Sequence, residues 1–197
     1  MSEIKLGEVE SVRSKRSKLV IQISGGAIFA AISIAISPIV SIIPRLPGWG
    51  FAFFDPTSLP WIFSFLIFGP IAGILSTSIG SLGLVLWDPT GIGPLFKFLA
   101  TIPLIIIPTI FLKLYKQGNG KRTSNKLMNP LNYAIFGIIA LIVRILLMLI
   151  INGAIYGFSV YVITFVLLIN SIQTAFDLII PYIVVFGLRY DERFQYW

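Results

Sequence analysis

The sequence predicts an all-α integral membrane protein, built as a six-transmembrane-helix bundle with the N- and C-termini in the cytoplasm. Composition is the first reason, because 56% of the 197 residues are hydrophobic and only 12% are charged, whereas soluble domains carry about 25% charged residues. The second reason is a series of apolar runs close to the roughly 20 residues that a membrane helix requires. The third is that basic residues gather in three segments, which an even number of spans places on one side.

Six spans are expected, and they are 19–43, 57–68, 71–87, 94–115, 131–152 and 167–188. They leave polar tails at 1–18 and 189–197 and a basic loop at 113–130. These three segments hold twelve of the fifteen Lys and Arg residues, and such residues mark the cytoplasmic side of a plasma-membrane protein. The net charge of +7 is therefore explained by membrane orientation, and no nucleic-acid partner is expected.

Prolines predict irregularities in two spans. Pro103 and Pro108 are expected to kink the fourth span, because proline removes a backbone N–H and clashes with the preceding turn. The run 160–188 is too long for one ordinary span, so its first third is expected along the outer interface. The sixth span would then start near Leu167 and bend at Pro181.

The residues that most catalytic and metal sites need are missing. The chain has no Cys and no His, which removes disulfides, thiolate chemistry, typical zinc sites and imidazole acid–base catalysis. It also lacks the GxxxxGK[ST] phosphate-binding loop. We therefore expect a protein that is not an enzyme and has no catalytic residue, metal or cofactor of its own.

The most distinctive stretch is 51–97, which holds two apolar segments joined by Gly69 and Pro70. The tripeptide Asp-Pro-Thr stands before the first segment at 55–57 and again after the second at 88–90. As a membrane hairpin, this stretch places both tripeptides at one membrane face and the Gly-Pro turn at the other.

Charges inside a bilayer are costly, and they mark a substrate path or a buried ion pair. Arg144 and Asp177 fall near the middle of spans five and six, so we expect them to pair. Asn170, Gln173 and Asp177 share one helix face at i, i+3 and i+7, and Asn152 lies at a depth similar to that of Asn170. This polar stripe would suit a neutral, hydrogen-bonding ligand, or it would only join helices by hydrogen bonds.

Three further features have two interpretations each. Trp49 and Phe53 lie in an aromatic loop that is either an interfacial belt or a lid over a planar ligand. Lys97 would neutralise a nearby carboxylate, Asp55 or Asp88, or contact an acidic ligand group. A seam of small residues in the first span would pack inside this bundle or against a second membrane subunit. The seam consists of Ala27, Ala31 and Ala35.

With these features together, the chain resembles the S components (substrate-binding subunits) of energy-coupling factor (ECF) vitamin transporters, most nearly the riboflavin type. FDPTSLPWIFSFLIFGPIAGIL resembles that family's F-D-x-x-x-(I/L)-P entry into span two and its F-G-P-x-A-G turn into span three. TGIGPLFKFL is similar to the Gly-rich entry of span four, LMLIINGAIYGF to the end of span five, and INSIQ to the N-x-x-K pattern of span six. Gln173 stands where the riboflavin type has Lys, and the segment between Asn152 and Asn170 is shorter than usual.

The resemblance implies a subunit that captures a vitamin, riboflavin being the first expectation, at the outer face and hands it over for ATP-driven uptake. The implied ligand-binding residues are Asn152, Asn170, Gln173, Lys97, Trp49 and Phe53. The implied partners are the ECF transmembrane coupling subunit, contacted by the alanine seam, and two cytoplasmic ATPases. The alternatives are a membrane scaffold that binds no ligand and a small membrane-embedded enzyme that acts on lipid-linked substrates.

Overall fold

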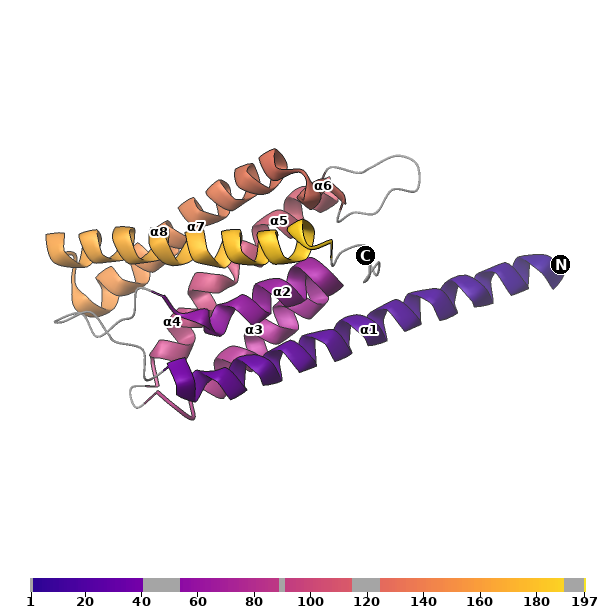
Figure 1. The fold of residues 1–197 in the computed structure, drawn as a ribbon, viewed down its shortest axis with the longest axis horizontal. Helices are drawn as coiled ribbons and strands as arrows, with labels where there is room; N and C mark the ends of the chain where they lie inside the picture. Colours follow the sequence, from indigo (N-terminus) through magenta and orange to yellow (C-terminus); the bar gives the residue numbers. More distant parts are fainter. Residues whose placement is uncertain (1, 41–53, 89–90, 115–124, 190–196) are drawn as a thin grey trace.

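The computed structural model describes residues 2–40, 54–88, 91–114, 125–189 and 197, with the backbone alone for 2–14 and 125. Within these ranges every regular element is a helix (Figure 1). The elements are α1 (Ser2–Val40), η1 (Pro56–Ser58), α2 (Leu59–Phe68), α3 (Pro70–Leu84), α4 (Gly93–Thr101), α5 (Pro103–Leu114), α6 (Asn125–Met128), α7 (Pro130–Tyr156), α8 (Val160–Tyr182) and η2 (Ile183–Gly187). The predicted all-α class is confirmed.

Four helical stretches of the described chain are long and apolar enough to cross a membrane. They are Lys15–Val40, Gly93–Leu114, Pro130–Tyr156 and Val160–Gly187. Two shorter apolar stretches, Pro56–Phe68 and Pro70–Leu84, fall below the length that spans an average bilayer. The chain therefore has the helices of a membrane protein, and its number of crossings depends on the hairpin that these two shorter stretches form.

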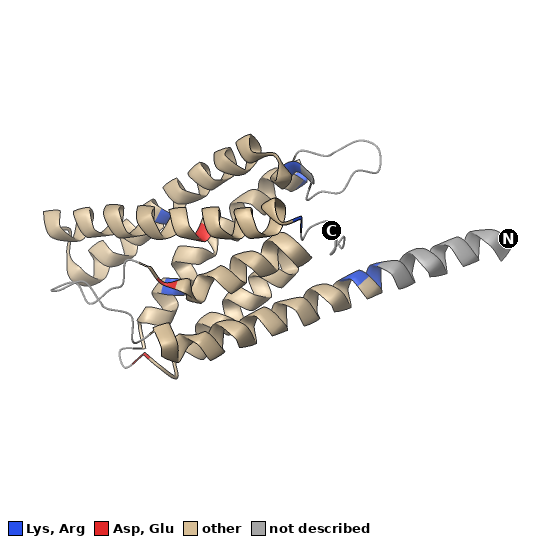
Figure 2. Cartoon of the chain, viewed as in Figure 1, with Lys and Arg blue, Asp and Glu red and all other residues tan. Residues whose placement is uncertain are grey.

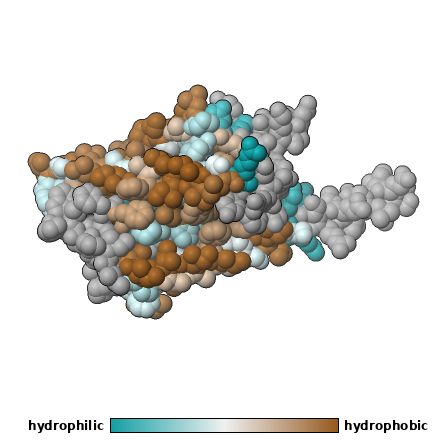
Figure 3. All heavy atoms as spheres, in the orientation of Figure 1, coloured by the Kyte–Doolittle hydropathy of each residue, from teal (hydrophilic) through white to brown (hydrophobic). Residues whose placement is uncertain are grey.

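The helices run roughly along one direction, and the α2–α3 hairpin packs between α1 and α8 (Figure 1). α1 extends well past the rest of the bundle at its N-terminal end. Lys and Arg lie on α1, at α6 and at the end of α8, while few charges lie along the other helices (Figure 2). Apolar residues cover most of the face seen in Figure 3, and hydrophilic ones gather toward the α6 end. This distribution is typical of a membrane bundle.

Glycines allow α2 and α3 to approach each other and α1 closely. A Cβ at Gly80 would lie 2.2 Å from the indole Nε1 of Trp61, and a Cβ at Gly26 would lie 2.9 Å from the carbonyl oxygen of Ala72. Trp61 is fully buried, so its ring occupies the space that a side chain at position 80 would need. Such contacts between helices with small residues are the usual way in which membrane helices pack tightly.

The turn between α2 and α3 is the Gly-Pro turn expected from the sequence. Gly69 has φ 104° and ψ −175°, a conformation that glycine adopts without steric cost. The Gly69 N–H donates to the Phe65 carbonyl at 2.9 Å. Pro70 then begins α3, where a missing N–H leaves no helical hydrogen bond unmade.

The fourth predicted span is divided into two helices. α4 ends at Thr101 and α5 begins at Pro103, because Pro103 has no N–H to continue the helical ladder. Pro108, also expected to cause a kink, lies inside the continuous α5. The predicted irregularity is thus an interruption at the first of the two prolines.

The sixth predicted span begins earlier than expected. Gly157, with φ 82°, ends α7, and Ser159 Oγ accepts a hydrogen bond from the Val162 N–H at 3.2 Å to cap α8. α8 is then helical from Val160 onward without interruption, so the helix starts earlier than the predicted Leu167, while the position of its first turns relative to the membrane interface stays a prediction. Strong termination and capping signals on both sides of a short connection explain the difference.

The other end of α8 changes its helical form. Pro181 lies inside α8 near its end and cannot donate the backbone hydrogen bond of a regular helix. Two residues after Pro181 the α-helix changes to a single π-helical turn, η2. The predicted disturbance at Pro181 therefore takes the form of a π turn, a common response to an interrupted ladder.

Several predicted features fall outside the described residues. These are the aromatic loop with Trp49 and Phe53, most of the basic loop 113–130, and all of the tail from 190 to 196. Two span ends shift within the described part, since α3 ends at Leu84 and α7 extends to Tyr156.

The close packing of the hairpin predicts a destabilising effect of Gly80→Ala. The new methyl group would collide with the buried Trp61 ring, and overpacking of this kind costs about 1–3 kcal/mol. The midpoint of thermal unfolding in detergent should fall by several degrees, at about 2–4 °C per kcal/mol for a chain of this length. Gly187→Ala is the control, because its Cβ would meet only Ile183 Cγ2 at 3.7 Å. Equal midpoints for the two variants would contradict the packing.

Candidate functional site

Arg144 of α7 is the centre of a polar network inside the bundle. Its side chain is 0% exposed, and its Nη1 donates to Asp177 Oδ2 at 3.0 Å. Nε and Nη2 donate to the side-chain oxygens of Asn170 and Gln173 at 2.9 and 3.1 Å. The three acceptors lie on one face of α8, as their spacing predicts. Arg144 and Asp177 therefore form the ion pair that was expected from their depths.

Asp177 connects this network to the start of the hairpin. Its Oδ1 accepts a hydrogen bond from Ser58 Oγ at 2.6 Å, and Ser58, the last residue of η1, is fully buried. A buried charge is tolerated only where a counter-charge and further hydrogen bonds replace its hydration. The guanidinium and the hydroxyl supply both, and they join α7, α8 and η1 at one point.

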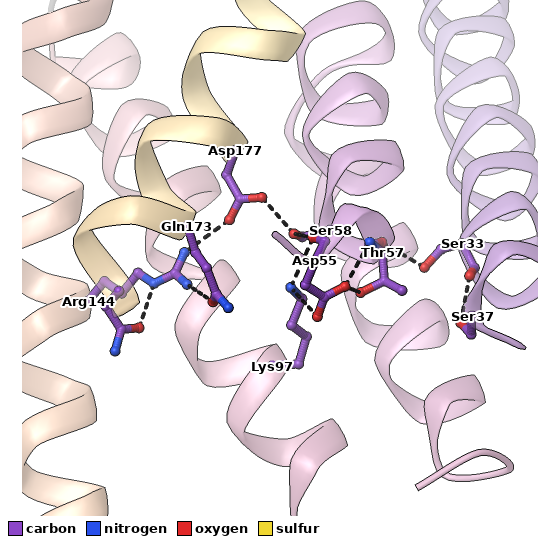
Figure 4. A network of polar contacts seen from close by, with 10 residues as sticks. Ser33, Ser37, Asp55, Thr57, Ser58, Lys97, Arg144, Gln173 and Asp177 are labelled. Carbon is purple, nitrogen blue, oxygen red and sulfur yellow. Dashed lines mark hydrogen bonds and ion pairs between the residues drawn. The ribbon is translucent and has the colours of Figure 1, made fainter. Parts of the chain in front are cut away.

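A second ion pair lies beside the first. Lys97 Nζ of α4 is 2.8 Å from Asp55 Oδ2, and Asp55 Oδ1 accepts from the Thr57 N–H at 3.0 Å. The Thr57 carbonyl accepts from Ser33 Oγ of α1 at 2.8 Å, and the backbone carbonyl of Ser33 accepts from Ser37 Oγ at 2.7 Å. Figure 4 shows these contacts running across the bundle from α7 to α1.

Asp55 is held in its ionised form. Burial raises the pKa of Asp55, but the Lys97 ammonium and the Thr57 donors lower it by more, and the pKa lies below its ordinary value. Because the folded-state pKa is the lower one, the ion pair stabilises the fold above the ordinary carboxyl range. This contribution is lost as the pH falls through the folded-state pKa.

A cavity of about 470 Å³ lies between the C-terminal ends of α1, α3 and α7, the helix α4 and the middle of α8, next to the Lys97–Asp55 pair. This volume is within the range of small-molecule sites, roughly 300–1,000 Å³. Its aromatic lining is Trp87, Phe96, Tyr156 and Phe165, and its polar lining includes Asp55, Asp88, Lys97, Asn152, Asn170 and Gln173. Apolar walls with a few converging polar groups are typical of ligand sites.

The structure brings four of the predicted ligand-binding residues to this one cavity. They are Asn152, Asn170, Gln173 and Lys97. Of the two partners considered for Lys97, the structure gives Asp55. The remaining two predicted residues, Trp49 and Phe53, lie outside the described chain.

The two asparagines offer different groups to the cavity. Asn152 Nδ2 donates to the Met148 carbonyl at 2.8 Å, so within the described residues its Oδ1 remains as an acceptor. Asn170 uses its oxygen for Arg144 and one amide hydrogen for the Val166 carbonyl at 2.9 Å. Its second amide hydrogen is what it can present to a ligand. The pair thus combines one acceptor with one donor.

The alanine seam of α1 faces away from the bundle. Ala27, Ala31 and Ala35 are exposed, whereas Ala30 and Ser33 on the opposite face are buried. The seam therefore does not pack inside this chain, and the first of its two predicted interpretations is excluded for the described residues.

Sequence reasoning missed the hydroxyl residues that connect the two ion pairs. Thr57 and Ser58 stand two and three residues after Asp55, and a carboxylate two residues before a backbone N–H is the signal of an Asx-type turn. That signal predicts the Asp55–Thr57 contact. It does not predict that Ser58 reaches Asp177, which lies 119 positions further along the chain.

Comparison of the chain with protein-family models, with curated proteins and with solved structures returns no match. No relative therefore supplies roles for these residues, and their assignment rests on geometry and chemistry. The resemblance to ECF S components, which rests on short sequence motifs, stays a prediction.

The buried ion pair predicts a specific pattern for Arg144→Met and Asp177→Leu. Each single variant leaves one buried charge without its partner, which costs about 3–5 kcal/mol, so the unfolding midpoint should fall by roughly 10 °C. The double variant R144M/D177L should be more stable than either single variant, because apolar groups of similar size often replace a buried pair without loss. Additive losses in the double variant would contradict this pairing.

Proposed function

We propose that the chain is a substrate-capture subunit of a membrane importer and binds a small polar molecule in the cavity beside Lys97. The observation that carries this proposal is the convergence of Asn152, Asn170, Gln173 and Lys97, from three different helices, on one cavity of ligand size. Hydrogen bonds that only join helices do not by themselves account for a space of this size with an aromatic lining.

We infer six membrane crossings, with the hairpin as two of them. Gly25 and Gly26 of α1 pack against Phe68 and Ala72, so the Gly-Pro turn lies level with the first apolar turns of α1. Lys18 is only about 10 Å from that level along the helix, at 1.5 Å per residue. The hairpin therefore reaches close to the basic end of the bundle, and its shortness would be met by local thinning of the bilayer.

The orientation follows from the charges of the described residues. Lys113 lies in the last turn of α5, Lys126 lies in α6 and Arg189 follows η2, while Lys15, Arg16 and Lys18 lie within α1, before its contacts with the hairpin turn. Figure 2 shows basic segments on α1 and at α6 on the same side of the bundle. The positive-inside rule makes this end cytoplasmic. In the plasma membrane, the N- and C-termini would then lie inside the cell, and the cavity would open toward the outside.

The lining favours a flat, hydrogen-bonding ligand. Phe96 and Tyr156 meet edge to face at 6.4 Å, and their rings give the cavity an aromatic wall. Asn152 supplies an acceptor and Asn170 a donor, a combination that matches a cyclic amide or imide edge. Riboflavin, which carries such an edge on a planar ring system, is our first candidate among vitamin-like molecules.

The exposed alanine seam supports a membrane partner. A flat row of small side chains allows another helix to approach closely, and in the resemblance to S components this partner is the ECF transmembrane coupling subunit. Two cytoplasmic ATPases would supply the energy, because this chain has no phosphate-binding loop. The chain itself would act by capture and transfer, without catalysing a reaction.

A membrane scaffold is the second candidate. The observation in its favour is that Arg144 already engages the oxygens of Asn170 and Gln173. Amide oxygens that accept internal hydrogen bonds need no ligand to explain them. The two candidates differ at Asn152, which lines the cavity and takes no part in the Arg144 network.

Ligand binding is tested first on protein purified gently in detergent, by absorbance and native mass spectrometry. We expect a bound vitamin-like molecule, and a flavin spectrum would identify riboflavin. Asn152→Leu should weaken riboflavin binding roughly tenfold, the usual effect of one lost hydrogen bond, while the unfolding midpoint of the ligand-free protein changes little. Asn132→Leu, at the start of α7 and away from the cavity, is the matched control. Protein that is free of ligand and unchanged in thermal-shift tests with a panel of vitamins would favour the scaffold.

The six-crossing topology predicts the accessibility of single cysteines, which the chain otherwise lacks. Ile71→Cys, beside the hairpin turn and 45% exposed, should react with a membrane-impermeant thiol reagent in inverted vesicles and not in intact cells. Leu86→Cys, at the other end of α3, should show the reverse. Labelling of both cysteines from outside would mean that the hairpin enters the bilayer without crossing it.

A further inference from the structure

We propose that the indole of Trp197 is an anchor that docks into a slot at the hairpin turn, far from the cavity. The slot is formed by α1, the end of α2 and the Gly69–Pro70 turn. It provides a hydrogen-bond acceptor, an aromatic neighbour and space for an indole. The proposal does not depend on the ligand or on the transport function proposed above.

The acceptor in the slot is a carbonyl that α2 cannot satisfy. Trp197 Nε1 donates to the Leu66 carbonyl at 3.2 Å. In a continuing helix this carbonyl would accept from the N–H of residue 70. Gly69 turns the chain away from the helical path, and Pro70 has no N–H. An indole N–H, which is only a donor, is therefore complementary to the group that the turn leaves unpaired.

The space in the slot depends on the absence of a side chain at Gly69. A Cβ there would lie 3.0 Å from ring atoms of Trp197 and 3.1 Å from Nε2 of Gln22 on α1. The Phe65 ring lies 5.6 Å from the Trp197 ring, at an interplanar angle of 43°. The indole thus fits between α1 and α2, and it packs on the main hydrophobic core of the bundle.

The contact joins parts of the fold that are distant in sequence. Trp197 follows α8 and η2, whereas Leu66 and Gln22 belong to α2 and α1. Docking of the indole therefore connects Trp197 to α2 and the hairpin turn, next to Gln22 of α1, at the basic end of the bundle. Gln22 is about 22 Å from the cavity residue Ser37 along α1, so the anchor restrains this end of the hairpin without contacting the ligand site.

The proposal is tested by hydrogen–deuterium exchange on the full chain in detergent micelles, followed at the peptide that covers residues 65–75. Trp197→Phe keeps a ring but removes the N–H donor, and exchange at the turn should rise about two- to tenfold, the usual weight of one neutral hydrogen bond. Trp197→Ala also removes the ring, and the rise should exceed tenfold. Trp87→Phe makes the same conservative change at the other end of the bundle and should leave this peptide unchanged.

Two results would overturn the anchor. One is unchanged exchange at residues 65–75 in Trp197→Ala, which would mean that the indole only rests on the surface. The other is an equal rise in every helix for both Trp197 variants, which would indicate global destabilisation in place of a local restraint. Riboflavin binding, measured on the same samples, should be equal in the wild type and in Trp197→Phe. Riboflavin binding tests the ligand proposal and exchange at residues 65–75 tests the anchor, so either proposal can fail without the other.

Discussion

The structure depends on the neutralisation of one buried guanidinium. Arg144 lies in the middle of an apolar helix with no exposed side-chain surface, where an unpaired charge would not be tolerated. Asp177 supplies the counter-charge, and Ser58 donates a hydrogen bond to the other carboxylate oxygen of Asp177. Since these groups come from α7, α8 and η1, satisfying one charge sets the relative position of three elements. A slip of α8 by one residue would turn all of its polar side chains away from Arg144.

The same contacts prepare the wall of the cavity. Asn170 cannot rotate freely, because its oxygen accepts from Arg144 and its nitrogen donates to the preceding turn of α8. Lys97 is similarly held by Asp55, whose partner Thr57 is connected to α1 through Ser33. Groups that are already ordered lose little conformational freedom when a ligand binds. The network that stabilises the bundle thus also lowers the entropic cost of recognition.

The features that could be predicted from the sequence follow from residue patterns within one segment or from the depth of residues in neighbouring spans. The all-α class follows from apolar runs, the Gly69–Pro70 turn from two residues with special backbone properties, and the Arg144–Asp177 pair from equal depth on neighbouring helices. The polar stripe on α8 follows from helical periodicity alone.

The features that could not be predicted depend on contacts between distant segments. The sequence left Lys97 with two candidate carboxylates, and only the position of η1 selects Asp55. It left the alanine seam with two possible faces, and the seam is exposed because Ser33 on the opposite side of α1 bonds to Thr57. Ser58 gave no signal, since nothing in its neighbourhood indicates a partner 119 residues away. The early start of α8 reflects the capping hydrogen bond of Ser159, which a hydropathy pattern does not detect.

α1 is longer than the helices it packs against, and this has a mechanical consequence. Its outer part is tied to the cavity wall through Ser33, while its N-terminal part extends past the bundle as a continuous helix (Figure 1). About 35 Å of helix separates Gly25, which packs against Phe68 next to the α2–α3 turn, from Ser2. A tilt of about 10° around that point moves the far end by about 6 Å. A small displacement of the cavity-lining part of α1 would therefore be accompanied by a larger displacement at Ser2.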